Sequence, residues 1–308
     1  MMLPHDLIID CDPGIDDALA LWLAASQTDR FRLRAVTTVA GNRPVDITSA
    51  NAIRLLDAAG RTEVPVYLGA AQPLDGSPAR CNLVHGADGL GGVELALTRP
   101  PEPLPAWQFL VHALEQHPSG TLTLATLGPL TNLALVEQHS PGLLRRFRQV
   151  VVMGGAVTCP GNITPAAEFN FYADPDAAQL VLQAGIEDLS LFGLDVTTKV
   201  AMSAAWLASL GTLPGRCASL AAAMLDAYAS ADPLLHDACP IAALLAPDLF
   251  HGEPWTLSVE TLPGQSAGQS TGKRRPAAQA RPGDVHVVQE VRPHAVLQLV
   301  REGLRALP

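Results

Sequence analysis

Four aspartates lie within eight positions near the start of the chain, in the segment IDCDPGIDDALA (9–20). Carboxylates held this close repel one another, so such a cluster normally either takes up protons or holds a cation. Asp10 and Asp12 are two positions apart, which in extended chain directs both side chains to the same side. A Pro-Gly pair then turns the chain, and Asp16 and Asp17 open a predicted helix.

Three kinds of chemistry are open to this cluster. Helix capping explains Asp16 or Asp17, but a helix N-terminus stabilises a negative charge by only ~0.3–1 kcal/mol, too little to hold four carboxylates. A hard cation with all-oxygen ligands, calcium or magnesium, resolves the repulsion. A phosphatase of the haloacid-dehalogenase type also begins with an apolar strand that ends in D-x-D. In that case Asp10 would be the nucleophile, Asp12 the acid and Lys199 the required lysine.

The segments around the cluster alternate between two patterns. Short apolar runs of strand length occur at 7–10, 33–41, 64–69, 121–128, 150–155 and 189–196, and helix-like runs at 16–26, 46–60 and 175–185. This alternation predicts an α/β fold with an open, mostly parallel, Rossmann-like sheet flanked by helices. Ligands of such sheets bind at the carboxyl ends of the strands, which is where the aspartates lie.

Two stretches interrupt this alternation. Residues 76–92 are rich in glycine and polar residues, which predicts a long loop near a site. Residues 263–283 contain few apolar residues and separate two strand-like runs, WTLSVETL and VHVVQEV. Only a short stretch of chain follows, so we expect 263–283 to be an exposed loop within a single domain, 1–308.

Composition excludes several classes of protein. The net charge is −10 and only two lysines occur, which argues against a nucleic-acid partner. The five cysteines are scattered and form no C-x-x-C pair, a pattern typical of free thiols in the cytoplasm. No stretch approaches the roughly 20 apolar residues of a membrane helix, and the N-terminus lacks the apolar core of a signal peptide. We therefore expect a cytoplasmic protein without a membrane or nucleic-acid partner.

The phrase DCDPGIDDALA (10–20) resembles the N-terminal signature of the nucleoside hydrolases, the inosine–uridine-preferring N-ribohydrolases. Five further segments resemble that family in the same order: TTVAGN (37–42), HGADGLGG (85–92), TLGPLTNLAL (126–135), VVMGGAVTCPGNITPAAEFNFYADPDAA (151–178) and LLHDACPIA (234–242). Each segment alone is weak, but six in register make a specific match. The last ~50 residues match only loosely.

The resemblance implies hydrolysis of the N-glycosidic bond of ribonucleosides, with one Ca²⁺ per subunit. The implied ligands are the carboxylates of Asp10, Asp17 and Asp237 and the main-chain carbonyl of Leu127. Calcium acidifies a bound water far less than zinc does, so a base is still needed, and Asp12 is the residue implied for that role. The resemblance also implies a homodimer or homotetramer.

Further residues are implied to bind the substrate. Side-chain amides and carboxylates suit the ribose hydroxyls, and the matching positions are Asp16, Asn42, Asn162, Glu168 and Asn170. Met153 matches a position in the pocket wall, although a methionine after three valines is more often part of the core. Asn42 follows a glycine and is also a common turn residue.

The departing base needs a proton or another way to take up negative charge. His236 and His85 are the candidates for this end of the pocket, and Tyr228 is the one aromatic residue near His236 that could stack or donate. The segment before His236, residues 224–237, is shorter than the family pattern, which leaves the base preference open.

The alternatives to a ribonucleoside hydrolase are a hydrolase of another N-ribosyl substrate, the phosphatase, or a ribose- or nucleoside-binding protein without turnover. The presence of both Asp12 and His236 argues against the last of these.

Overall fold

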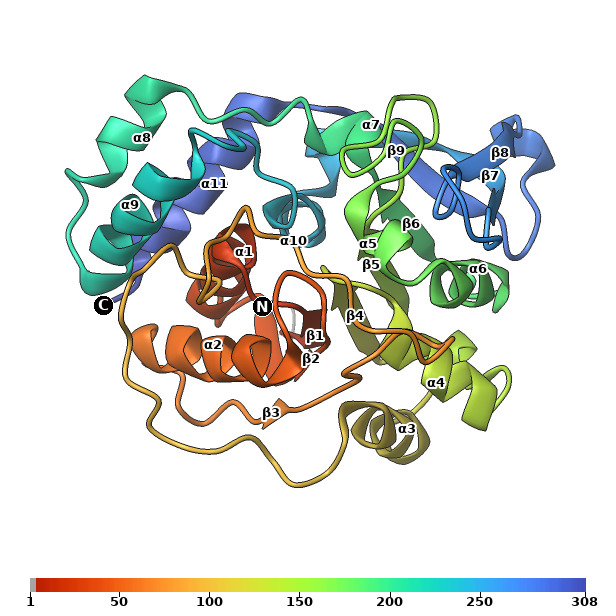
Figure 1. The fold of residues 1–308 in the computed structure, drawn as a ribbon, viewed down its shortest axis with the longest axis horizontal. Helices are drawn as coiled ribbons and strands as arrows, with labels where there is room; N and C mark the ends of the chain where they lie inside the picture. Colours follow the sequence, from red (N-terminus) through yellow and green to blue (C-terminus); the bar gives the residue numbers. More distant parts are fainter. Residues whose placement is uncertain (1–3) are drawn as a thin grey trace.

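One mixed sheet runs through the computed structural model, which describes residues 4–308 (Figure 1). The strand order within these residues is β3-β2-β1-β4-β5-β6-β9-β7-β8, and all neighbours as far as β9 are parallel, whereas β7 is antiparallel to both β9 and β8. The strands are β1 His5–Cys11, β2 Phe31–Thr38, β3 Val66–Tyr67, β4 Leu122–Thr126, β5 Gln149–Met153, β6 Leu189–Phe192, β7 Phe250–Val259, β8 Ser270–Arg274 and β9 Val285–Val291.

Helices connect most of the parallel strands. They are α1 Ile15–Ser26, α2 Val45–Ala58, α3 Ala106–Gln116, α4 Thr131–His139, α5 Phe169–Ala173, α6 Pro175–Gln183, α7 Leu194–Thr197, α8 Ala204–Leu210, α9 Arg216–Tyr228, α10 Ala238–Leu245 and α11 Pro293–Ala306. Short 3-10 helices are η1 Leu143–Arg146, η2 Pro247–Leu249 and η3 Ala277–Gln279. The predicted single α/β domain with a mostly parallel sheet is confirmed.

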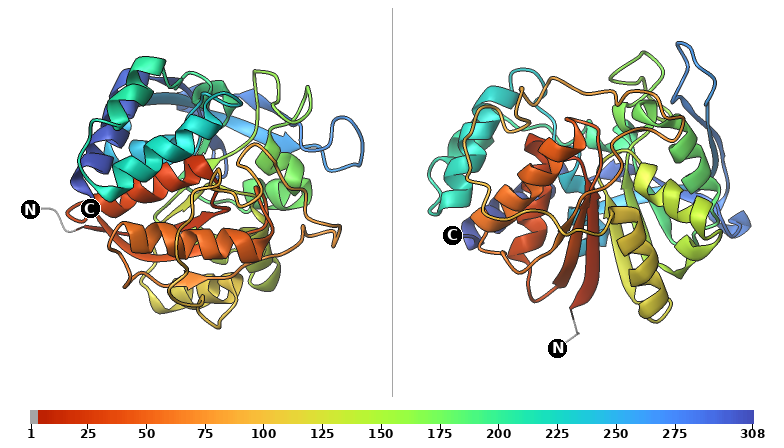
Figure 2. Two further views of the ribbon diagram at one scale, coloured as in Figure 1. Left: turned by 60° about the vertical axis from the view of Figure 1, so that its left-hand side comes forward. Right: turned by 60° about the horizontal axis from the view of Figure 1, so that its bottom comes forward.

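Helices cover both faces of the sheet (Figure 2). Successive side chains of a strand point to opposite faces, and β1 shows this clearly. Leu7 and Ile9 pack into a core with α1, α2, α9, α10 and α11, whereas Ile8 packs into a second core with α3, α4 and α6. A strand buried on both faces reads as a continuous apolar run, which is why 7–9 is uniformly hydrophobic.

The order of the strands changes direction between β1 and β4. From β1 the chain proceeds outward through β2 to β3, and it then returns to β4 and proceeds in the other direction through β5 and β6. A crevice forms at such a switch point, outside the carboxyl ends of the strands. Asp10 pairs with Thr37 of β2 and Thr126 of β4, so the residues that follow these three strands meet at this edge.

The structure differs from the sequence-based prediction in two elements. The run 189–196 is a strand only as far as Phe192, because the chain turns at Gly193 into α7. Residues 263–283, expected to be an exposed loop, contain β8, which pairs with β7 at the edge of the sheet. The strand carries mostly exposed polar and charged side chains, so its hydropathy gives no strand signal. Within 4–308, no helix is both long and apolar enough to cross a membrane.

Candidate active site

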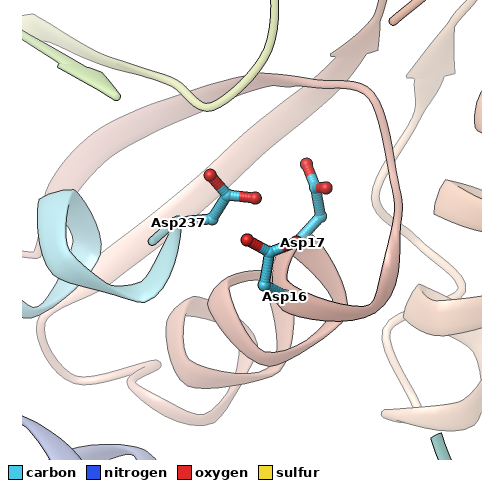
Figure 3. A group of neighbouring side chains, drawn as sticks. All are labelled: Asp16, Asp17 and Asp237. Atoms are coloured by element: carbon cyan, nitrogen blue, oxygen red, sulfur yellow. The ribbon is translucent and has the colours of Figure 1, made fainter. Parts of the chain in front are cut away.

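Three carboxylates converge at the carboxyl edge of the sheet (Figure 3). Asp16 and Asp17 lie in the first turn of α1, and Asp237 is the residue that precedes α10. One oxygen from each of the three lies within 4.8 Å of the others, and all three residues are buried. Residues 220 positions apart in the sequence therefore form one cluster.

Asp12 lies beside this cluster, directly after β1, and two glycines make room for its side chain. An added Cβ at Gly41 would lie 2.0 Å from Asp12 Oδ2, and one at Gly128 would lie 2.5 Å from Oδ1. The backbone N–H of Asn42 donates to Asp12 Oδ2 over 2.6 Å, and the Asn42 side chain also donates to Asp17 Oδ2 over 3.2 Å. Asn42 thus links the two carboxylates, and glycine is required on both sides of Asp12.

Asp10 lies in a different environment from the three converging carboxylates. Its Oδ1 accepts hydrogen bonds from the Thr37 hydroxyl and, over 2.7 Å, from Asn132 Nδ2. Asn132 also donates to the Thr38 carbonyl over 2.9 Å, so Asp10 connects β1 to β2 and α4. Asp16, rather than Asp10, lies beside Asp17 and Asp237. The chain leaves β1 at Cys11, so strand alternation does not extend to Asp12.

The electrostatics of the carboxylates fit a bound cation. Burial raises the pKa of Asp10 to about 7 and that of Asp17 to about 6, and it raises the pKa of Asp12, Asp16 and Asp237 as well. One oxygen on each of four carboxylates is buried without a hydrogen-bond partner: Asp10 Oδ2, Asp12 Oδ1, Asp16 Oδ1 and Asp17 Oδ1. Unpartnered buried oxygens are costly. Because these are hard oxygen donors, the cluster could hold a metal ion such as calcium or magnesium.

His85 reaches the site from the long glycine-rich loop. Its Nδ1 accepts from the backbone N–H of Ile15 over 3.1 Å, which places the proton of the neutral ring on Nε2, 3.9 Å from Asp16 Oδ1. Burial lowers the pKa of His85 to about 4, although Asp17 acts in the opposite direction. The ring stacks on Tyr228, with 5.1 Å between centroids and 16° between planes. His85 is therefore a neutral imidazole in an aromatic wall at neutral pH.

His236 differs from His85 in its partners. Nδ1 lies 2.8 Å from the Thr197 hydroxyl and Nε2 lies 3.3 Å from Asp232 Oδ2. Burial alone would lower the pKa of His236, but the hydrogen bond to Asp232 and the charge of Asp16 raise it above the ordinary value. Of the two histidines, His236 is the one whose surroundings favour the protonated ring.

The segment after β5 supplies a further part of the pocket wall. Glu168 caps α5 by accepting backbone hydrogen bonds over 2.8 Å from Asn170 and 3.1 Å from Phe171, and it also accepts one over 2.7 Å from Gly155, which follows β5. Burial raises the pKa of Glu168, and these bonds oppose the rise. Asn162 is exposed at the rim and accepts from the backbone N–H of Phe169 over 3.0 Å.

Asn170 continues this wall toward β4 and β5. Its Nδ2 donates to the carbonyl of Leu127 over 2.8 Å, and it also lies 3.2 Å from both the carbonyl oxygen and Sδ of Met153. Leu127 follows β4 directly, and its backbone N–H donates to the Asp10 carbonyl over 2.7 Å. Asn170 thus joins the ends of β4 and β5 beside the pocket.

One pocket brings together most of the residues that the sequence predicted. Its lining consists of Asp16, Asn42, Asn82, Val84, His85, Leu127, Met153, Asn162, Glu168, Phe169, Asn170, Tyr228, Asp232, His236 and Asp237. The predicted residues Asp10, Asp12 and Asp17 lie in the buried layer beside it.

Four of the lining residues were not predicted individually. Asn82 and Val84 belong to the glycine-rich loop, which did carry a signal, and Phe169 lies between two predicted residues. Asp232 lies in the short segment before His236 and has no local pattern to mark it. Thr197, the partner of His236, was also missed, because its only signal is a contact across 39 positions.

Lys199 does not belong to the site. Its Nζ donates to the main-chain oxygen of Gln289 on β9, and the side chain does not line the pocket. A phosphatase of the haloacid-dehalogenase type would need this lysine beside the aspartates, so the geometry disfavours that alternative.

Comparison with known proteins identifies the family and agrees with the fold. The family model for "Inosine-uridine preferring nucleoside hydrolase" matches residues 7–298. The non-specific ribonucleoside hydrolase RihC of Escherichia coli is 37% identical over 313 residues and covers 100% of both chains. Uridine nucleosidase 1 of Arabidopsis thaliana is 38% identical over 265 residues, 83% of this chain and 78% of that protein. A solved plant nucleoside hydrolase, PpNRh1, has a TM-score of 0.90 with 31% identity, and the match covers 98% of this chain and 99% of that chain.

The family match assigns this doubly wound α/β fold, with its carboxylate pocket at the switch point, to the hydrolases of N-glycosidic bonds. The chain belongs to the inosine–uridine preferring nucleoside hydrolase family. The resemblance seen in its sequence motifs is thereby confirmed.

Proposed function

We propose that the protein hydrolyses ribonucleosides to ribose and free nucleobase in a calcium-dependent reaction. The observation that carries this proposal is the buried carboxylate cluster beside a pocket lined with amides and two histidines. A sugar offers several hydroxyls at fixed geometry, which such side chains can bind, and a carboxylate cluster favours the positive charge that develops on a ribosyl ring.

The metal ligands in this proposal are Asp17 and Asp237 from the converging group, together with Asp10 and the Leu127 carbonyl. Asp10 keeps an unpartnered Oδ2, and the Leu127 carbonyl accepts one bond from Asn170 and retains a second lone pair. When bound, calcium would orient the ribose hydroxyls and a water and neutralise the clustered charge. Calcium suits this site better than magnesium because it tolerates irregular coordination.

Asp12 is the proposed general base. Its Oδ2 is fixed by Asn42, whereas Oδ1 is buried without a partner and is therefore free to accept a proton from water. As the water oxygen bonds to C1′, the water proton passes to Asp12 and the bond from C1′ to the base nitrogen breaks. Burial and the charge of Asp17 raise the pKa of Asp12, which strengthens it as a base once it is ionised.

The ribose contacts proposed for the pocket are those of Asp16, Asn42, Asn162 and Asn170. Glu168 is also proposed there, although its carboxylate already accepts three backbone hydrogen bonds. At the other end, His236 is the proposed proton donor to the departing base because its surroundings favour the charged ring. His85, Tyr228 and Met153 would form the wall around the base.

The names of the relatives point to ribonucleosides but differ in the nucleobase. RihC is named a non-specific ribonucleoside hydrolase, and the Arabidopsis relative a uridine nucleosidase. We extend the proposal to both purine and pyrimidine ribonucleosides, with another N-ribosyl compound as the alternative. A homodimer or homotetramer in the cytoplasm completes the proposal and rests on the sequence arguments.

The test is Asp12→Asn, with Asp6→Asn on β1 as the matched control. Asp6 forms ion pairs with Arg32 and Arg34 away from the pocket. We expect Asp12→Asn to keep calcium binding, measured by calorimetry, and to lose at least ~10²-fold in kcat. Near-normal turnover in Asp12→Asn would exclude Asp12 as the base, and loss of turnover in both variants would point to structural damage.

A further inference from the structure

His236 has a hydrogen-bond partner at each ring nitrogen. Nδ1 lies 2.8 Å from Thr197 Oγ1, and Nε2 lies 3.3 Å from Asp232 Oδ2. A carboxylate only accepts hydrogen bonds, so Nε2 carries the proton in this contact. Asp232 and His236 both line the pocket, so the N–H group of the imidazole lies at the pocket wall.

Thr197 is a rigid partner for the other nitrogen. It is the last residue of α7 and is 0% exposed, and its backbone N–H donates to the Gly193 carbonyl over 3.1 Å. A β-branched side chain has few rotamers, so the hydroxyl is held in place by its own backbone. The hydrogen-bond partner of this buried hydroxyl is Nδ1 of His236.

Asp232, four residues after the end of α9, is also held by backbone hydrogen bonds. Its Oδ1 accepts from the backbone N–H of Leu234 over 3.1 Å, and its own N–H donates to the Tyr228 carbonyl over 3.0 Å. This arrangement leaves Oδ2 for His236. One oxygen of the carboxylate is therefore held by the local backbone, and the other contacts the imidazole.

The segments that carry Thr197 and Asp232 are also hydrogen-bonded to each other. The N–H of Met202 donates to the Pro233 carbonyl over 2.7 Å, and the N–H of Leu235 donates to the Val200 carbonyl over 3.0 Å. The stretch after α7 and the stretch before His236 thus form one hydrogen-bonded unit. Thr197 lies at one end of this unit and Asp232 at the other, with the imidazole between them.

We propose that Thr197 and Asp232 are positioning residues that fix the ring orientation of His236 and keep a proton on Nε2, so that Nε2–H is directed at the departing nucleobase. This inference rests on the proposed function, in which His236 serves the leaving group. A bound nucleobase with an acceptor nitrogen or oxygen would take over the hydrogen bond from Nε2 that Asp232 accepts in this structure. Without either partner the ring can rotate, and Nε2–H is no longer presented to the base.

The test compares two substrates with different demands on the leaving group. A nucleoside releases a basic nucleobase that needs protonation, whereas p-nitrophenyl β-D-ribofuranoside releases a phenolate that is stable without a proton. The variants are Thr197→Val, which keeps the shape and removes the hydroxyl, Thr197→Ser, which keeps the hydroxyl, and Asp232→Asn. Thr198→Val is the matched control, because the Thr198 hydroxyl bonds to the Leu194 carbonyl and lies outside the pocket.

We expect Thr197→Val and Asp232→Asn each to lower kcat on uridine and inosine by about 10-fold or more, while kcat on the p-nitrophenyl riboside and the KM values change by less than about 3-fold. Thr197→Ser should recover most of the nucleoside activity. Equal losses on both substrates, unchanged nucleoside turnover, or a Thr197→Ser variant as slow as Thr197→Val would overturn the inference. A wild-type protein inactive on every riboside would instead overturn the proposed function on which the inference rests.

Discussion

The buried carboxylates predict an unusual dependence of stability on pH when calcium is removed. The pKa of Asp17 rises from 3.8 to about 6 and that of Asp10 to about 7 because burial disfavours their charged forms. An acid with a raised pKa in the folded state binds more protons folded than unfolded, so the free energy of unfolding falls as the pH rises through that window. In the metal-free protein this contribution is fully present below about pH 4 and is lost by about pH 7 to 8.

The size of the effect follows from the pKa values. One pKa unit corresponds to about 1.4 kcal/mol, so Asp17 alone costs about 3 kcal/mol at neutral pH and Asp10 about 4 kcal/mol. His85 acts in the opposite sense between about pH 4 and 6.5, because burial lowers its pKa to about 4. The carboxylates outweigh this histidine by a few kcal/mol, a large share of the 5–15 kcal/mol typical of folded proteins.

Urea unfolding in chelator and in excess calcium, from about pH 5 to pH 8, measures this dependence. We expect stability in chelator to fall toward pH 8 and the gain from calcium to grow over the same range, because the ligands must be ionised to bind the ion. Asp17→Asn should flatten the curve in chelator and weaken the response to calcium. A chelated protein whose stability does not change between pH 5 and pH 8, or one that calcium does not stabilise, would refute the reasoning.

Three further substitutions give expected outcomes. In Gly41→Ala the new Cβ would lie 2.0 Å from Asp12 Oδ2, so we expect kcat to fall by about 10²-fold while the protein stays folded; unchanged kcat would show that Asp12 does not need this position. Lys199→Met should leave ribose release within about 2-fold of wild type, because Lys199 lies outside the pocket, and a large loss would revive the phosphatase alternative. Glu168→Gln should lower the free energy of unfolding by about 1–3 kcal/mol in urea titrations, because an amide nitrogen replaces an oxygen that caps α5; equal stability would contradict the capping role.

Local patterns in the sequence were sufficient for the parallel part of the fold. The sequence predicted β1 and α1 because β1 is a buried apolar run and α1 is a run of alanine and leucine that has two aspartates in its first turn and is buried along almost its whole length. The sequence did not predict the antiparallel end of the sheet, because β8 is a polar edge strand whose pairing with β7 depends on contacts beyond its own residues.

Some residues of the site could likewise be predicted from local sequence patterns, whereas others depend on contacts between distant parts of the chain. The aspartates of 9–20 were found from their spacing, and Asp237 only through the family resemblance. The different environments of Asp10 and Asp16 depend on where β1 ends and on Thr37 and Asn132, neither of which the spacing reveals. Asp232 was missed because its contact with His236 requires the loop that joins α9 to α10 to be folded.

The most direct test of the proposed function is release of reducing sugar from inosine, adenosine, guanosine, uridine and cytidine, with p-nitrophenyl phosphate as a phosphatase control. We expect calcium-dependent release of ribose from one or more of these nucleosides, no effect of added phosphate, and no release of p-nitrophenol from the phosphate ester. Release of p-nitrophenol without any release of ribose would contradict the assignment of the carboxylate pocket to ribonucleoside hydrolysis.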